Sequence, residues 1–189
     1  GGESPVEQHQ RNCLMEGIKN ALPDDYIVLS DSDEIPDFTK IEDINLTKKY
    51  LAFSQKMFMY KLNLQNLNES NWIGSKITKK KYIKSKQDLR NLKFKKYPFW
   101  RIDKYNQEII NGGWHFSFLQ SPHQILTKIK SFSHGEFNKE GINEKNIEEK
   151  ILRNEDIFER KNKLKKVTID NSYPDYIINN KDKLSNWII

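Results

Sequence analysis

The residues with the clearest chemical potential are three carboxylates within a run of four residues, Asp31, Asp33 and Glu34, directly after the apolar segment Tyr26–Leu29. Like charges this close repel one another, so a cation bound between them is favoured. Alternate residues of an extended segment point the same way, so we expect Asp31 and Asp33 to face one ion. Hard oxygen ligands suit Mg²⁺ or Mn²⁺, and two carboxylates leave most of an octahedral shell open for phosphate oxygens. The pattern therefore indicates an enzyme that cleaves or transfers an activated phosphate ester.

An apolar strand that ends in Asp-x-Asp has three interpretations. Phosphatases of the haloacid-dehalogenase type carry Asp-x-Asp-x-Thr/Val, with the first Asp as nucleophile, and Ile35 stands at the Thr/Val position here. Glycosyltransferases of the GT-A type use Asp-x-Asp to hold a metal on the diphosphate of a nucleotide sugar. The third interpretation is an acidic loop at a strand end that binds nothing. These residues by themselves leave all three open.

Segments on both sides of the acidic run narrow the choice. Arg11-Asn12, followed by Gly17 and the apolar strand, resembles the Arg-Asn-x-Gly to Asp-x-Asp order of many GT-A enzymes. Four further segments belong to one pattern: SDSDEIP (30–36), WR (100–101), GGWHFS (112–117) and KIKSFSHGE (128–136). With these segments the chain resembles glycosyltransferase family 17 over roughly residues 8–138, and the best-known members of that family add the bisecting N-acetylglucosamine to N-glycans.

The resemblance implies an α/β fold, with a GT-A-like mixed sheet flanked by helices and truncated at its N-terminal βαβ unit. It implies an inverting transfer of a sugar, N-acetylglucosamine by preference, from a UDP-sugar to a glycan acceptor, with Mn²⁺ or Mg²⁺ as cofactor. The competing hypothesis is a degenerate GT-A-derived module that binds a glycan or a partner without turnover. The absence of an N-terminal βαβ unit ahead of the Arg-Asn helix favours that module.

The candidate site residues fall into three roles. The expected metal ligands are Asp33 directly, Asp31 directly or through water or ribose, and His134. The candidates for catalysis are Glu136 as the base, His115, and Glu34, which would orient the loop or approach the donor sugar. The candidates for binding the donor or the acceptor are Arg11, Asn12, Trp114, Arg101 and Lys128. Each has a structural alternative: a histidine is more often a structural hydrogen-bonding group than a ligand, Trp114 is either core or a sugar platform, and the cations are equally surface charges.

The elements that position these residues are predicted from hydrophobic spacing. A capped helix over Ser4–Leu22 would bury Cys13 on its apolar face. The strand Tyr26–Ser30 is a continuous apolar run, typical of a strand buried on both faces of a parallel sheet. Pro36 starts a short helix to about Ile44. Extended segments follow at Tyr50–Leu64 and Trp72–Tyr82.

Glycine marks two special places in the later part of the chain. Gly74 indicates a bulge or a close backbone approach, and Asn111–Gly113 is predicted to be a turn before the next strand. A helix begins at Ser121-Pro122 and runs to about Phe132. A charged helix is expected from Asn143 to about Lys166, and its thin apolar stripe predicts docking on the surface. We expect one partial GT-A domain over residues 1–189, with this charged helix and a tail from about 143.

Composition limits the alternatives further. The net charge of +6 favours an anionic partner, and a doubly charged nucleotide sugar is one. The densest basic run, Lys79–Lys81, is more often a solvated strand end than a binding patch, and no aromatic-basic signature for single-stranded nucleic acid stands out. The family resemblance implies a nucleotide-sugar donor and a glycan acceptor as partners, and the composition adds no sign of nucleic acid.

The compartment is left open by the same residues. The single cysteine, Cys13, excludes an intramolecular disulfide. No apolar run approaches the roughly 20 residues of a membrane span, and no signal-peptide pattern opens the chain. These features favour the cytoplasm, whereas the Golgi lumen would require that an N-terminal anchor had been removed.

Overall fold

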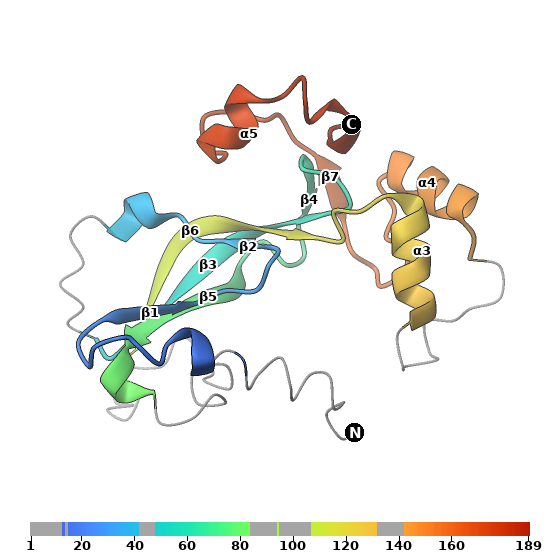
Figure 1. Cartoon of the computed structure of the whole chain (residues 1–189). Helices are drawn as coiled ribbons and strands as arrows, with labels where there is room; N and C mark the ends of the chain where they lie inside the picture. The colour runs from blue at the N-terminus through green and yellow to red at the C-terminus, as the bar shows by residue number, and fades with distance from the viewer. Residues whose placement is uncertain (1–12, 14, 42–47, 84–93, 95–106, 132–141) are drawn as a thin grey trace. The chain divides into compact units, whose positions relative to one another are not determined.

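The computed structural model describes residue 13 and residues 15–41, 48–83, 94, 107–131 and 142–189. Figure 1 shows strands, which pair into one sheet, together with several short helices. The chain divides into two compact units, residues 1–55 with 73–113 and residues 56–72 with 114–189. Strands β3 (Tyr50–Met59) and β6 (Gln107–Ser117) pass through both units. The mixed α/β architecture agrees with the predicted GT-A-like fold class.

The first unit is built around the strand that precedes the acidic run. Strand β1 (Tyr26–Leu29) pairs antiparallel with β5 (Trp72–Lys79), with Tyr26 opposite Lys79 and Leu29 opposite Lys76. Strand β2 (Glu34–Ile35) pairs with β6. The 3₁₀ helices η1 (Phe38–Ile41) and η2 (Lys80–Tyr82) follow β2 and β5. A small apolar cluster of Leu51, Phe53 and Ile77 lies under these strands.

The second unit contains the larger cores and the helices. Strand β4 (Leu64–Asn66) pairs antiparallel with β3 and with β7 (Leu164–Lys166). Helices α3 (Pro122–Ser131) and α4 (Glu144–Leu152) lie side by side (Figure 1). The short helices α5 (Asp175–Asn179) and η5 (Ser185–Trp187) belong to the C-terminal segment.

Two apolar clusters hold the second unit together. The first joins β3 and β4 to α3 and α4 and contains Met57, Met59, Tyr60, Leu64, Ile125, Ile129, Ile147, Ile151 and Ile157. The second joins β3 and β6 to the C-terminal segment and contains Phe58, Leu62, Trp114, Phe116, Ile169, Tyr173 and Ile177. The C-terminal segment is therefore part of the packed structure, because it supplies three buried side chains of the second cluster.

The predicted role of the first strand is wrong in one respect. Strand β1 is antiparallel to β5, and its residues alternate between exposed and half-buried, with Tyr26 49% and Val28 41% exposed. Among the described residues β1 stands at one end of the sheet order β1-β5-β3-β4-β7. A short apolar run does not distinguish a doubly covered strand from one at a sheet edge.

The helix before β1 is also shorter than predicted. Residues 15–17 are helical and residues 18–20 form a turn, so the helical pattern does not continue to Leu22. Leu22 is 66% exposed and Cys13 is exposed, which contradicts the predicted burial of both on one apolar face. A backbone bond from Asp25 to the Leu22 carbonyl and a side-chain bond from the Leu22 N–H to Asp25 turn the chain into β1 instead.

Later elements correct two further expectations and confirm a third. Strand β6 runs straight through residues 111–113, where a turn was predicted. Helix α4 begins after its predicted cap Asn143 but ends at Leu152, and the predicted continuation to Lys166 is wrong because β7 lies there. Ile147 and Ile151 are the buried residues of α4, at 1% and 4% exposed, and most of its other residues are exposed, so the helix packs through a thin apolar stripe as predicted.

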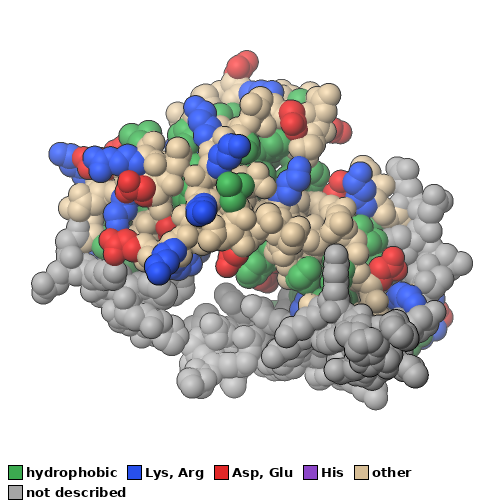
Figure 2. Space-filling model, turned by 180° about the vertical axis from the view of Figure 1, so that it is seen from behind, with side chains coloured by type: hydrophobic (Ala, Val, Ile, Leu, Met, Phe, Trp, Pro, Cys, Tyr) green, Lys and Arg blue, Asp and Glu red, His purple; other side chains and the backbone are tan. Residues whose placement is uncertain are grey.

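Charged side chains are dispersed over the described part of the face that Figure 2 shows. In Figure 2 the Lys and Arg side chains of the face shown are scattered among acidic and neutral ones. In the run Lys79–Lys81, the Nζ atoms of Lys79 and Lys81 lie 3.0 and 2.7 Å from the Asp24 carboxylate. The lysine partners lower the pKa of Asp24. The run therefore fastens the start of β1 to the end of β5, which agrees with the strand-end interpretation.

Candidate active site

The acidic run forms a closed turn between β1 and β2, which we call the acidic turn (Ser30–Glu34). The Glu34 N–H donates to the Asp31 carbonyl over 3.0 Å, and the Asp31 N–H donates to Glu34 Oε2 over 3.3 Å. The Ser30 hydroxyl donates to the Glu34 carbonyl over 3.0 Å. Serine and aspartate favour such turns because their short side chains bond to nearby backbone groups. The acidic turn is thus defined by its own residues.

The two aspartates of the acidic turn differ in exposure. Asp31 is exposed and Asp33 is half-buried. Ser32 and Asp33 lie in the turn itself, so the expectation that strand alternation aims both carboxylates at one ion does not apply. Glu34 is half-buried, and its carboxylate faces back toward the backbone of Asp31. Both roles predicted for Glu34, orienting the loop and approaching the donor sugar, stay predictions.

A buried polar pair lies directly behind the acidic turn. Ser75 Oγ is 2.6 Å from Ser30 Oγ and 3.4 Å from Glu34 Oε2. Gln55 Nε2 donates to Ser75 Oγ over 3.0 Å. Ser75 and Gln55 are both 0% exposed. The acidic turn is therefore connected by hydrogen bonds to β5 and β3, the two strands next to it in the sheet order.

Three glycines make room for this arrangement. A Cβ on Gly74 would overlap Gln55 Oε1 and would lie 2.8 Å from Glu34 Cδ. Gly113 has φ +112°, and a Cβ there would lie 2.5 Å from the Ile35 carbonyl oxygen and 3.0 Å from Gln55 Cγ. A Cβ on Gly112 would lie 2.9 Å from Lys40 Cγ. The predicted close approach at Gly74 is confirmed, and the Gly112-Gly113 pair lets β6 pack against the segment that follows the acidic turn.

The donor set fits a metal that is shared with a ligand better than one held by protein alone. Among the described residues no group of three or more His, Cys, Asp or Glu side chains could hold a metal ion. The acidic turn offers the hard carboxylate oxygens of Asp31 and Asp33, while Glu34 bonds within the turn. A Mg²⁺ or Mn²⁺ ion with two protein carboxylates takes its remaining ligands from water and phosphate oxygens.

Three other predicted site residues belong to the second unit. His115 is 7% exposed, and its ring centroid lies 4.8 Å from that of Trp72. Trp114 packs in the second apolar cluster and donates its Nε1–H to the Ser172 carbonyl over 3.1 Å. Lys128, on α3, places Nζ 4.5 Å from the ring centre of Phe118. The packing of Trp114 matches its core alternative, and the chemical roles of these three residues stay predictions.

The remaining predicted site residues lie outside the residues that the structure describes. They include one of the expected metal ligands, the expected base and the three other expected binding residues. They are Arg11, Asn12, Arg101, His134 and Glu136.

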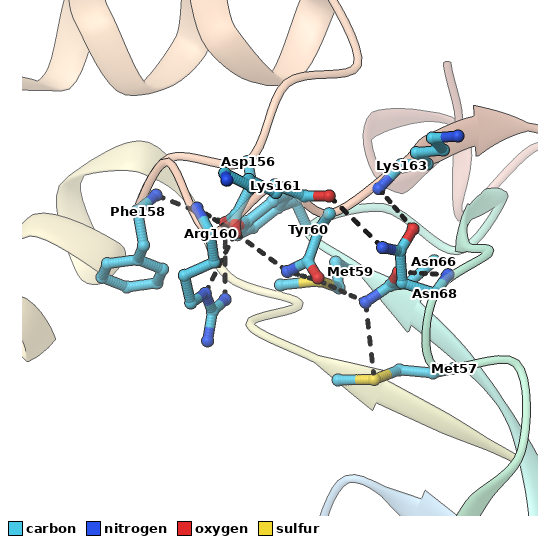
Figure 3. Close-up of polar contacts among 11 residues, drawn as sticks. Met57, Met59, Tyr60, Asn66, Asn68, Asp156, Phe158, Arg160, Lys161 and Lys163 are labelled. Carbon is cyan, nitrogen blue, oxygen red and sulfur yellow. Dashed lines mark hydrogen bonds and ion pairs between the residues drawn. The ribbon is translucent and has the colours of Figure 1, made fainter.

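The second unit holds a different polar cluster, centred on the single carboxylate of Asp156, which we call the Asp156 network (Figure 3). The Tyr60 hydroxyl donates to Asp156 Oδ1 over 2.6 Å, and Arg160 Nε donates to Oδ2 over 3.0 Å. Asn162 Nδ2 donates to Oδ2 over 2.9 Å, and the N–H groups of Phe158 and Arg160 each add a bond of 3.3 Å. Every bond ends on one carboxylate whose side chain is 2% exposed.

Electrostatics distinguish the Asp156 network as structural. Burial alone would raise the pKa of Asp156, but its bonds to Arg160 and Tyr60 outweigh burial and lower that pKa. Burial and the bond to Asp156 raise the pKa of Tyr60 far above its usual range. Tyr60 also has φ 66°, a strained conformation for a tyrosine. This network has an internal counter-ion and a full set of donors, so it needs no ligand.

A surface groove of about 780 Å³ opens beside β7 in the second unit, and none of the predicted site residues lines it. Its walls are formed by Asn63, Lys166, Val167, Thr168, Ile169, Lys181, Asp182, Ser185 and Ile188.

Sequence reasoning missed the residues behind the acidic turn. Ser30 stands out in the sequence only as part of the SDSDEIP motif, and Gln55 and Ser75 belong to none of the motifs. A usable signal existed: Gln55 interrupts the apolar strand LAFSQKMFM, where a buried amide requires partners. What could not be read from the chain was that β5 would place Ser75 beside it.

The comparison with family models identifies a relationship over most of the chain. The model of glycosyltransferase family 17 matches residues 3–163. No curated protein and no solved structure matches the chain. Within the described residues, no helix has the length and apolar character needed to cross a membrane.

Proposed function

Since the chain belongs to glycosyltransferase family 17, we propose that it transfers N-acetylglucosamine from UDP-N-acetylglucosamine to a hydroxyl of a glycan acceptor, with inversion and with Mn²⁺ or Mg²⁺. Membership of the family establishes the chain as a glycosyltransferase, an enzyme with a donor and an acceptor substrate. The donor sugar, the metal and the stereochemistry are the proposed part.

The observation that carries the proposal is the acidic turn. It holds the exposed Asp31 and the half-buried Asp33 just after β1, and Glu34 accepts from the Asp31 N–H and lies near Ser75. Two carboxylates balance a divalent ion but leave most of its shell open. A diphosphate completes such a shell with its own oxygens, so the described donor set suits a nucleotide diphosphate sugar.

The chemistry divides between the acidic turn and residues outside the described part. When bound, the metal would act as a Lewis acid on the leaving diphosphate. Asp31 and Asp33 would hold it, and Glu34 would keep their turn in shape. In the transfer, the bond from the sugar anomeric carbon to the diphosphate oxygen breaks, and the acceptor oxygen bonds to that carbon from the opposite face. The acceptor proton passes to a base, for which Glu136 remains our prediction.

The first experiment measures metal and nucleotide binding. Thermal unfolding is followed with Mn²⁺ alone, UDP alone and both together, for wild type and for Asp33→Asn. We expect UDP with Mn²⁺ to raise the unfolding temperature of wild type and to leave the variant unchanged. Asp25→Asn is the matched control, because Asp25 lies at the other end of β1 and its bond to the Leu22 N–H can be kept by an amide oxygen. Equal responses of wild type and Asp33→Asn would contradict the metal site.

The second experiment identifies the donor and the stereochemistry. UDP-N-acetylglucosamine is compared with UDP-glucose, UDP-N-acetylgalactosamine and GDP-mannose by saturation-transfer NMR, and the anomeric coupling of any product reports inversion or retention. We expect the strongest signal from UDP-N-acetylglucosamine and a β-linked product. Binding of UDP and Mn²⁺ without transfer to any glycan in a broad acceptor panel would favour the binding-module hypothesis.

A further inference from the structure

We propose that Gln55, Ser75 and Ser30 form a relay of hydrogen bonds that holds the acidic turn in its metal-binding shape before the metal arrives. The inference rests on the proposed function, because it concerns the same metal site. It assigns these three side chains as positioning residues for Asp31 and Asp33.

The direction of the hydrogen bonds shows where the relay ends. The Gln55 side chain can donate only through Nε2, and this group donates a hydrogen bond to Ser75 Oγ. The Ser75 hydroxyl then donates either to Ser30 Oγ at 2.6 Å or to Glu34 Oε2 at 3.4 Å. The Ser30 hydroxyl reaches the Glu34 carbonyl at 3.0 Å. If Ser75 donates to Ser30, the last bond runs from Ser30 to the Glu34 carbonyl; if Ser30 donates to Ser75, the last bond runs from Ser75 to the Glu34 carboxylate. In both cases the relay ends on Glu34, whose carboxylate accepts from the Asp31 N–H.

The relay occupies space that an apolar core would ordinarily fill. Gln55 and Ser75 are 0% exposed, and they belong to the same strands as the buried Leu51, Phe53 and Ile77. Gln55 Oε1 is buried and has no hydrogen-bond partner among the described residues. An unpaired buried acceptor is destabilising, and a nonpolar side chain of similar shape would avoid it. The amide at this position therefore serves the residues that it contacts, and those lead to the acidic turn.

Backbone geometry is arranged for the same contact. The missing Cβ of Gly74 is what lets Gln55 Oε1 and the Glu34 carboxylate approach β5. The missing Cβ of Gly113 leaves room for Gln55 Cγ and for the Ile35 carbonyl. Two glycines in two different strands thus open space for one glutamine and for the end of the acidic turn.

The acidic turn needs such support because its own charges oppose it. Three carboxylates within four residues repel one another whenever no cation is bound. A turn that opens without metal must be reordered on binding, and this lowers the apparent affinity by the fraction of competent molecules. A buried relay anchored on β3 and β5 keeps that fraction high.

The test is a Mn²⁺ titration of the whole chain, with and without UDP and without a sugar donor, in which electron paramagnetic resonance measures free Mn²⁺. Ser30→Ala and Ser75→Ala remove the two hydroxyls, and Ser30→Thr restores one. Because Ser30 is exposed, its variants should fold. Ser54→Ala is the matched control, since it removes a hydroxyl from a residue that is 9% exposed and next to Gln55.

We expect Ser30→Ala and Ser75→Ala to raise the Kd for Mn²⁺ about five- to tenfold, the effect of one lost hydrogen bond to a charged or turn-closing group. Ser30→Thr should restore the Kd to within about twofold, and Ser54→Ala should not change it, on the same scale. A merely structural role would lower the unfolding temperature without this pattern of loss and rescue.

The outcomes separate the relay from the proposed function. If wild type does not bind Mn²⁺ with or without UDP, the metal site fails and the relay fails with it. If wild type binds and Asp33→Asn does not, while Ser30→Ala and Ser75→Ala keep the wild-type Kd, the relay alone is wrong.

Discussion

The Asp156 network and the acidic turn use hydrogen bonds to carboxylates in opposite ways. In the Asp156 network the donors of five groups converge on one buried carboxylate, and Arg160 supplies the counter-ion. In the acidic turn the bonds run between neutral donors and Glu34, and they leave Asp31 exposed. A carboxylate that is saturated by its own chain stabilises the fold, whereas the bonds within the acidic turn leave the Asp31 carboxylate exposed to solvent.

The difference also concerns which side chains were conspicuous in the sequence. The acidic turn is a dense run of charges, and it is visible by inspection. Tyr60 and Asp156 are separated by 96 residues and carry no recognisable motif. A strongly perturbed pKa is often taken to mark a functional site. Here burial is the largest cause of the raised pKa of Tyr60, and the bonds from Arg160 and Tyr60 lower the pKa of Asp156 against burial, so both shifts arise within the packed network around the Arg160–Asp156 ion pair.

The largest expected effect on stability comes from breaking the Asp156 network. In Asp156→Asn, whichever oxygen becomes the NH₂ group faces donors from Arg160, Asn162 or Tyr60, and the charge that balances Arg160 is lost. We expect the free energy of unfolding to fall by about 3 kcal/mol, as measured by urea denaturation. The neighbouring exposed Glu155→Gln is the control and should change it by less than about 0.5 kcal/mol. A loss in Asp156→Asn as small as that of the control would show that the network is not a stabilising unit.

The next largest effect is expected from filling the space behind the acidic turn. Gly74→Ala places a methyl group against Gln55 Oε1 and the Glu34 carboxylate, and overpacking of this kind costs about 1–3 kcal/mol. Gly17→Ala is the matched control, because nothing lies within 4 Å of its Cβ position. Urea denaturation should show a loss only for Gly74→Ala. If both variants are equally stable, β5 does not approach the acidic turn as closely as described.

Acid should weaken the stabilisation that the Asp156 network provides. The folded-state pKa of Asp156 is lowered, so its contribution is present above the unfolded pKa and is lost as the pH falls through the folded value. We therefore expect the stability difference between wild type and Asp156→Asn to shrink below about pH 4, the ordinary Asp value. Urea denaturation across pH 2–7 measures this difference. A difference that stays constant down to the lowest pH would mean that Asp156 is not the titrating group.

The smallest stability effect is expected where the functional effect is largest. Asp31→Asn and Asp33→Asn each remove one of three neighbouring like charges. For Asp31→Asn, whose side chain is exposed, the free energy of unfolding should change by less than about 0.5 kcal/mol and should not fall. The same variants should lose the unfolding-temperature response to UDP with Mn²⁺. Strong destabilisation by Asp31→Asn would place the acidic turn in the same structural class as the Asp156 network.

Local patterns in the sequence were good guides where the structure is local. The cap at Ser121-Pro122 correctly predicted the start of α3, and Asn143 caps α4 by accepting from the Asn146 N–H at 2.9 Å. The close approach at Gly74 was also foreseen. Predictions failed where a distant partner decides the outcome. The run Tyr26–Leu29 looked doubly buried but is antiparallel and half exposed, and Gly112-Gly113 looked like a turn but lies within a strand.

The candidate site shows the same division. Asp31, Asp33 and Glu34 were selected from their chemistry and spacing, and the family was identified from short motifs. Glu34 was assigned two possible roles, which stay predictions, and only the structure shows its contacts with Asp31 and Ser75. Gln55 and Ser75 received no role, because a single polar residue in a strand does not reveal which neighbour it will meet.

The sequence by itself therefore determined the chemistry that this protein can offer: a run of carboxylates directly after a strand, within a recognisable glycosyltransferase family. Only the tertiary structure decided which carboxylate is saturated by hydrogen bonds within the fold, as Asp156 is, and which is exposed to solvent, as Asp31 is. The physical reason is that a hydrogen bond or an ion pair requires two groups within about 3 Å. Strand pairing, which joins residues far apart in the chain, sets that distance for Ser75 with Ser30, and long-range packing sets it for Tyr60 with Asp156.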